Sequence, residues 1–148
     1  MVETVFRLER LPAGLIEDPR DGIELTWADR LKTRARRRTI GGVEFGLALP
    51  RGTVLRDGDC LALDHPRLVV VVQEALEPVV AVRPESAGQW ALWAYYIGNS
   101  HLPLMIAGDA LVCADDPGVE QVLAYHLIPF TRERRPFTPV SAAPGHHV

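Results

Sequence analysis

The chain has few cysteines and no pattern of a membrane-spanning or secreted protein. Its 148 residues include 2 cysteines, Cys60 and Cys113, which do not form a C-x-x-C pair. This argues against a disulfide scaffold and predicts two reduced thiols. No apolar run reaches the roughly 20 residues that cross a bilayer, and no basic region with an apolar stretch and a cleavage site begins the chain. We therefore expect a cytoplasmic protein without membrane contact.

The common catalytic and nucleotide-binding motifs are also missing. The chain has no Walker A loop, no G-x-G-x-x-G, no G-x-S-x-G and no H-E-x-x-H. Nucleotide binding, serine hydrolysis and zinc-protease chemistry therefore lack their usual sequence signals. We predict that the chain is not an enzyme. The alternative is a small enzyme that uses His101 with Asp109 or Asp115, which needs a pocket that the sequence does not show.

Acidic residues slightly outnumber basic ones overall, but positive charge is concentrated in one segment. The formal net charge of -3 argues against a polyanion such as nucleic acid as the main partner. Residues 30–38 nevertheless form a basic run, and alternate positions of a strand point to one face. Two interpretations stay open: charge that protects an edge strand from aggregation, and a docking stripe for an acidic peptide or partner. The basic residues are Arg30, Lys32, Arg34, Arg36, Arg37 and Arg38.

The first half of the chain has the pattern of an all-β domain. Short apolar segments alternate with turn sequences such as Asp21-Gly22 and Asp57-Gly58, which favour tight turns. Val69 to Val72 form a continuous β-branched run, typical of a strand buried on both faces. We predict an all-β domain over residues 1–75 that binds a peptide or partner, with strands at residues 4–6, 23–26, 32–39, 44–49, 60–63 and 68–73.

The second half changes its pattern near Pro78, which lacks a donor for a sheet ladder. The predicted order is strand, helix, strand, strand, helix, strand, which is the split βαβ order of a ferredoxin-like fold. Ser86 is the expected N-cap of the first helix, and Gly98-Asn99 its expected end. The chain is thus predicted to be α+β, with a ferredoxin-like βαββαβ domain for metal binding and dimerisation at residues 76–136 and a flexible tail at residues 137–148. The predicted strands are 79–83, 102–106, 110–113 and 130–135, and the predicted helices begin at Ser86 and Pro117.

One histidine lies at a predicted junction between two elements. The segment from Tyr95 to Pro103 reads Tyr-Tyr-Ile-Gly-Asn-Ser-His-Leu-Pro and leads from the first helix into a strand. Such junctions are exposed and rigidly held, and a neutral imidazole is the commonest protein ligand for a transition metal. His101 is therefore either a surface histidine after a turn or a metal ligand.

The same segment resembles the aromatic-His-Leu-Gly-Asn-Arg-His-x-Pro signature of the urease accessory protein UreE family, the nickel metallochaperones of urease maturation. His101 aligns with the metal-binding histidine of the family. Tyr96 stands where the family usually has its first histidine, and Ser100 where it usually has arginine. The matching residues are Gly98, Asn99, His101 and Pro103.

The resemblance extends through most of the chain. Leu25 to Arg30, followed by alternating arginines, is similar to a basic run of the family. Gly46 to Gly52 and Leu55 to Leu61 are similar to its Gly-x-x-Leu-x-Arg-Gly and Leu-x-x-Gly-Asp-x-Leu blocks. No single block is specific to the family, but the occurrence of all the blocks in this order is.

The resemblance implies a homodimer with an interfacial metal held by His101 of each chain, often supplemented by a His-bearing C-terminus. The number of ligands that a metal needs agrees with such a dimer. A stable site needs about four ligands, and a two-fold axis through the His101 position brings the imidazole of the second chain to the same metal. His146 and His147 are candidates for the remaining ligands; the alternative is a chain end without a role. Cys113 and Asp115 lie where other members carry peripheral histidines, so a peripheral site is not expected.

The resemblance also implies the cargo and the partners. Ligand chemistry alone does not separate Ni²⁺ from Cu²⁺ or Zn²⁺, both of which we expect to bind in vitro, so nickel as the physiological metal is implied by the family. The implied partners are the GTPase among the urease accessory proteins and the apo-urease complex, with no nucleic acid and no membrane. The alternative function is a protein- or nucleic-acid-binding module that uses the basic strand Arg30–Arg38.

Overall fold

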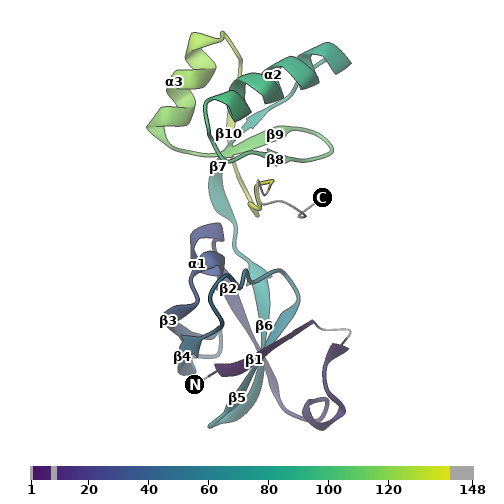
Figure 1. Ribbon diagram of the computed structural model, residues 1–148, viewed down its shortest axis with the longest axis vertical. Coiled ribbons are helices and arrows are strands. Elements are labelled where there is room, and N and C mark those ends of the chain that lie inside the picture. Colours follow the sequence, from purple (N-terminus) through teal and green to yellow (C-terminus); the bar gives the residue numbers. More distant parts are fainter. Residues whose placement is uncertain (1, 8–9, 141–148) are drawn as a thin grey trace. The chain divides into compact units, whose positions relative to one another are not determined.

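The computed structural model describes the backbone of residues 2–7 and 10–140 and divides the chain into two compact units, Met1–Ala75 and Leu76–Val148. The first unit is rich in strands, and the second combines one sheet with two longer helices, α2 and α3 (Figure 1). The predicted α+β class, with an all-β first part and a ferredoxin-like second part, is confirmed. The first part carries a short helix, α1, and a 3-10 turn, η2, besides its strands.

The N-terminal unit is built on a four-stranded sheet in the order β1-β5-β6-β2 and a two-stranded sheet, β3-β4. β2 runs parallel to β6, and the other neighbours are antiparallel. Apolar side chains from both sheets form its core, with Leu55, Val70 and Val72 each 0% exposed. The elements are β1 (Val2–Arg7), η2 (Ala13–Leu15), β2 (Arg20–Leu25), α1 (Trp27–Leu31), β3 (Arg34–Arg38), β4 (Glu44–Ala48), β5 (Asp59–Asp64) and β6 (Arg67–Glu74).

The Asp21-Gly22 pair was predicted to be a turn, and this was wrong. Both residues lie inside β2, where Gly22 is paired with Val71 of β6. Glycine gives room there to the end of a neighbouring side chain, because a Cβ on Gly22 would lie 2.7 Å from Gln73 Nε2, which would have to shift. The Asp21 carboxylate accepts hydrogen bonds from Thr39 and from the N–H groups of Gly22 and Gly41, which lower its pKa. Asp21 thereby ties the turn after β3 to β2.

The C-terminal unit has a four-stranded antiparallel sheet in the order β10-β7-β9-β8. This is the strand order of a ferredoxin-like fold, in which each helix connects two parallel strands that have another strand between them. Both helices lie on the same side of the sheet (Figure 1). The elements are β7 (Glu77–Val82), α2 (Ala87–Asn99), β8 (Met105–Ile106), β9 (Leu111–Ala114), α3 (Pro117–Tyr125) and β10 (Thr131–Arg135).

The core of this unit lies between the helices and the sheet. Val80 and Leu111 of the sheet and Ile97 and Leu123 of the helices are each 0% exposed and belong to one apolar cluster. Burial of such a side chain contributes about 1.5–3 kcal/mol to folding. The partly buried aromatic residues of α2 pack against the same cluster. These residues are Trp90, Trp93 and Tyr96.

Several boundaries of the second half differ from the prediction, and the strand predicted at residues 102–106 is only Met105–Ile106. The first strand begins at Glu77 and includes Pro78, whose carbonyl accepts from Asp115 N. Residues 137–140, predicted to belong to a flexible tail, pack on the unit: Phe137 is 2% exposed, and Val140 N donates to Leu104 O at 2.7 Å. The remaining predicted tail, residues 141–148, lies outside the described residues. Within the described part, no helix has the length and apolar character to span a membrane.

Candidate metal centre

Helix α2 leads directly to His101. Its first turn is capped by Ser86, whose side chain accepts from Gln89 N at 3.1 Å. Its last turn is held by Ile97, which is buried in the core, and by Ser100, whose hydroxyl donates to Tyr96 O at 2.9 Å. The helix ends at Asn99, in agreement with the end predicted at Gly98-Asn99.

His101 itself supplies the left-handed residue that ends α2. Its φ is 60°, and its N–H donates to Gly98 O at 3.0 Å. Glycine is usual at this position, and histidine is one of the few other residues enriched there. The left-handed conformation costs about 1–2 kcal/mol for a residue with a Cβ. The backbone of His101 is thus fixed by the helix end.

The side chain of His101 is exposed, and no hydrogen bond or ion pair joins its ring to another described residue. Neither ring nitrogen is therefore occupied by a contact within the described part of the chain. A fixed backbone and an open imidazole suit a metal ligand. In that part of the chain, however, no group of three or more His, Cys, Asp or Glu side chains is arranged to hold a metal. The described part of one chain therefore supplies an incomplete metal site.

A stack of aromatic rings connects the C-terminal ends of the two helices. The rings of Tyr96 and His126 are parallel within 7°, with centroids 3.9 Å apart. Tyr95 and Tyr125 add edge-on contacts at 6.1 Å and 4.9 Å. This contact between Tyr96 and His126 was not predicted from the sequence. The two residues are far apart in sequence, and no motif signals the pairing.

Apolar side chains stay exposed beside this stack. Tyr125 and Leu127 are 83% and 88% exposed, and Leu127 ends α3 with a φ of 57°. On α2, Leu92 and Tyr95 are 47% and 56% exposed. Large apolar side chains that stay exposed near one another are candidates for an interaction surface.

The residues at the positions where other family members carry peripheral histidines have other contacts. Cys113 is buried in the core, and burial, with a smaller contribution from the charge of Asp116, raises the pKa of its thiol to about 12. Asp116 caps α3 by accepting from Val119 N at 3.0 Å. Asp115 forms an ion pair with Arg132 at 3.3 Å. Because Cys113 stays a thiol and both carboxylates are engaged, these residues do not suit a metal site.

Asp109, the other carboxylate considered for catalysis, belongs to an ion-pair network. Arg135 Nη1 donates to Asp109 Oδ1 at 2.9 Å, and Arg83 pairs with Glu133 at 2.5 Å. Hydrogen bonding to Arg135 lowers the pKa of Asp109 to about 2, and hydrogen bonding to Arg83 lowers that of Glu133 to about 2. A carboxylate with so low a pKa is a poor general base near neutral pH.

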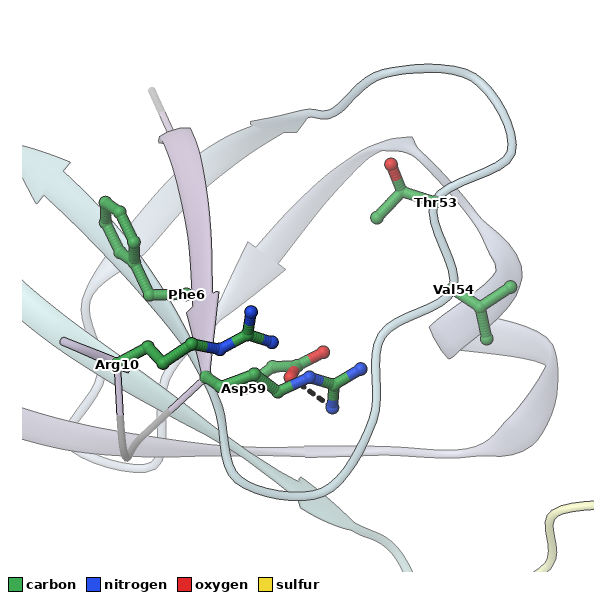
Figure 2. A pocket seen from close by; sticks show the side chains of 6 residues that line it. Phe6, Arg10, Thr53, Val54 and Asp59 are labelled. Carbon is green, nitrogen blue, oxygen red and sulfur yellow. Dashed lines mark ion pairs between the residues drawn. The ribbon is translucent and has the colours of Figure 1, made fainter. Parts of the chain in front are cut away.

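The N-terminal unit has a surface pocket of about 440 Å³ (Figure 2). The one carboxylate in its lining, Asp59, is paired with Arg7 at 2.6 Å. The lining offers no imidazole and no thiol, so it lacks the usual nucleophile and base of an active site. The lining residues are Phe6, Arg7, Arg10, Thr53, Val54 and Asp59.

Comparison with protein families assigns both units. Residues 7–74 match the UreE urease accessory protein N-terminal domain, and residues 77–148 match the UreE urease accessory protein C-terminal domain. The chain belongs to the UreE family. The match to the UreE C-terminal domain includes His101 and the aromatic stack, and the match to the UreE N-terminal domain includes the basic strand β3.

Individual UreE proteins agree with this assignment. The urease accessory protein UreE of Paraburkholderia xenovorans is 38% identical over 83% of this chain, and the alignment spans 54% of its own length. That of Rhodobacter capsulatus is 36% identical over 91% of this chain and 83% of its own. That of Deinococcus radiodurans is 34% identical over 87% of this chain and 83% of its own. The chain thus spans about half the length of the Paraburkholderia UreE protein and most of the other two.

Proposed function

We propose that this chain is a nickel-binding metallochaperone that supplies nickel for urease assembly in the cytoplasm, and that it is not an enzyme. Membership of the UreE urease accessory family supports the place in urease maturation. The observation that carries the metal role is the placement of His101. Its imidazole is exposed, no described residue pairs with the ring, and its backbone is fixed at the end of α2.

The proposed site is shared by two copies of the chain. One imidazole cannot hold a transition metal tightly, and an isologous dimer brings a second one to the same axis. The exposed apolar side chains at the ends of α2 and α3 support such a dimer, because pairing removes them from water. Each protomer then contributes its own His101.

The C-terminal histidines are proposed as further ligands, and chain length supports this. Val140 is held beside Leu104, and Leu104 is three residues from His101, a separation of at most about 11 Å. His146 follows Val140 by six residues, which span at most about 21 Å. The segment after Val140 is therefore long enough for His146 and His147 to reach the His101 of their own protomer.

Nickel is the cargo of this proposal and has to be released. Imidazole ligands bind Ni²⁺, Cu²⁺ and Zn²⁺, so selectivity rests on metal supply and on the recipient rather than on affinity. An exposed site with ligands from two chains can be taken apart one ligand at a time. We propose the GTPase of the urease accessory proteins and the apo-urease complex as the recipients.

Equilibrium dialysis against Ni²⁺, with the mass in solution measured in parallel, tests the proposal. His101→Ala should lose the tight site and remain a dimer. His65→Ala is the matched control, since His65 is an exposed histidine in the turn between β5 and β6 of the other unit. Native affinity and stoichiometry in His101→Ala would contradict the metal role, and a monomeric native protein would contradict the shared site.

Removing residues 145–148 tests the tail ligands separately. The truncated protein should stay dimeric and bind nickel more weakly or with lower stoichiometry, because His146 and His147 are lost. Unchanged binding would leave His101 as the ligand and remove the tail from the site.

A further inference from the structure

The basic run of the sequence separates into two sets of side chains. Arg30 is 1% exposed and pairs with Glu74 at 3.3 Å, and Arg37 pairs with Asp29 at 3.3 Å, so both stabilise the fold of the N-terminal unit. Arg34, Arg36 and Arg38 of β3 are exposed. No ion pair or hydrogen bond connects these three guanidinium groups to another described residue.

The backbone of the same strand has an open edge. β3 pairs with β4 and with no other strand of the described chain. Thr39 N donates to Val43 O and Leu49 N donates to Thr33 O, both at 2.9 Å, at the two ends of this ladder. Hydrogen-bonded positions alternate along an antiparallel strand, so Ala35 and Arg37 also direct their N–H and C=O groups to β4.

Arg34, Arg36 and Arg38, the intervening residues, consequently direct their N–H and C=O groups to the open edge. The same three residues thus combine exposed cationic side chains with backbone groups that are available for pairing. Small neighbours across the ladder leave space beside two of these side chains, because Gly46 faces Arg36 and Ala48 faces Arg34, whereas Glu44 faces Arg38.

We propose that β3 is a docking strand for an extended acidic segment of a partner protein. The segment adds to the open edge as a further strand, and its carboxylates at alternate positions lie opposite Arg34, Arg36 and Arg38. Alternate residues of a strand are about 6.6–6.8 Å apart, so a Glu-x-Glu-x-Glu pattern matches the spacing of the three arginines. Arginine binds carboxylates through paired N–H groups, and the ladder supplies affinity that does not depend on the side chains.

Charge complementarity selects this occupant. Three exposed guanidinium groups in a row, none of them paired with a described residue, favour an anionic partner. Alternate side chains of an added strand lie on one face, so one carboxylate can lie at each guanidinium group. A nucleic acid would use the same charge but not the free N–H and C=O groups of the edge. The proposal goes beyond nickel carriage, since every residue that carries it belongs to the N-terminal unit.

The test is fluorescence anisotropy with a labelled Thr-Glu-Val-Glu-Thr-Glu-Val peptide and the full chain at low salt. The combined variant Arg34→Ala, Arg36→Ala and Arg38→Ala should weaken binding about tenfold or more. The control variant Arg10→Ala, Arg51→Ala and Arg56→Ala removes the same charge from exposed arginines elsewhere in the unit. It should retain most of the affinity. Equal losses in the two variants would overturn the proposal.

Two modified peptides separate strand addition from simple charge attraction. A permuted peptide with its three glutamates in sequence should bind about tenfold more weakly, because its carboxylates no longer match the strand period. N-methylation of the amides at the glutamates should abolish binding of an antiparallel segment, whereas methylation at the intervening residues should not. For a parallel segment the expected result is reversed: methylation at the intervening residues should abolish binding, and methylation at the glutamates should not.

Equal binding by both methylated peptides would exclude an added strand. A single-stranded RNA of equal charge that binds more tightly than the peptide would make β3 a nucleic-acid surface and overturn the proposal. The combined variant Arg34→Ala, Arg36→Ala and Arg38→Ala should bind nickel in equilibrium dialysis as tightly as the native protein does. Failure of the docking proposal and failure of the nickel proposal therefore give different results. Circular dichroism confirms that each variant is folded.

Discussion

At the scale of single residues, the proposed metal ligand occupies a position that costs stability. His101 has a φ of 60° at the end of α2, where glycine would be the least strained choice. The ring of His101 is exposed and has no hydrogen bond or ion pair with another described residue. The proposed metal role accounts for the residue type, because strained positions are common at functional sites.

Comparing His101→Gly with His101→Ala tests this separation of function from stability. Both variants should lose tight nickel binding, because both lack the imidazole. Glycine adopts the left-handed conformation without a Cβ clash, so His101→Gly should raise the free energy of unfolding by about 1 kcal/mol over His101→Ala. Urea denaturation followed by circular dichroism measures the difference. A glycine variant that is less stable than the alanine variant would mean that the left-handed residue is not a source of strain.

At the scale of elements, the sequence predicted the order of strands and helices well and their ends less well. The order after Pro78 followed from helical spacing in α2 and α3 and from alternation in the strands, because these patterns repeat over several residues. Gly22 misled the prediction, since glycine permits a turn but also permits a place inside a strand with close neighbours. Only the neighbours, Gln73 in the case of Gly22, decide between these uses.

The candidate site was predicted only in part for the same reason. His101 was found from a local pattern, and its exposure and place after α2 follow from the chain itself. The stack of Tyr96 on His126 and the packing of Val140 beside Leu104 depend on contacts between distant segments. No local spacing encodes such contacts, so they required the structure.

The ion-pair network of the C-terminal sheet should make the stability of this unit depend on acid. Asp109 and Glu133 have folded-state pKa values of about 2, lowered by Arg135 and Arg83, respectively. Unfolded carboxyls titrate near pH 4, so the unfolded chain binds protons first as the pH falls. The stabilisation is therefore complete above about pH 5 and is lost progressively towards pH 2.

Thermal unfolding measured from pH 6 to pH 2.5 tests this dependence. The double variant Asp109→Asn and Glu133→Gln should lose less stability on acidification than the native protein. Glu85→Gln is the control, because the Glu85 carboxylate forms no ion pair with the described residues. A double variant with the native pH profile would show that the network does not contribute to the acid dependence.

At the scale of the whole molecule, the two proposed roles divide along the chain. The docking edge of β3 lies in the unit Met1–Ala75, and His101 lies in the unit Leu76–Val148. Each sheet is completed within one unit, and no strand pairing of the described chain joins the two. Each unit also has its own apolar cluster. These features favour two parts that fold and bind independently.

Expressing residues 1–75 and 76–148 as separate chains tests that independence. The second fragment has the complete βαββαβ order, so it should fold, dimerise and bind nickel in a His101-dependent way. The first should bind the alternating acidic peptide and no nickel. Small units bury less surface per residue than larger ones, so each fragment should be less stable than the whole chain and yet unfold cooperatively. An unfolded second fragment, or a folded monomer at micromolar concentration, would mean that the metal-binding dimer depends on the N-terminal unit.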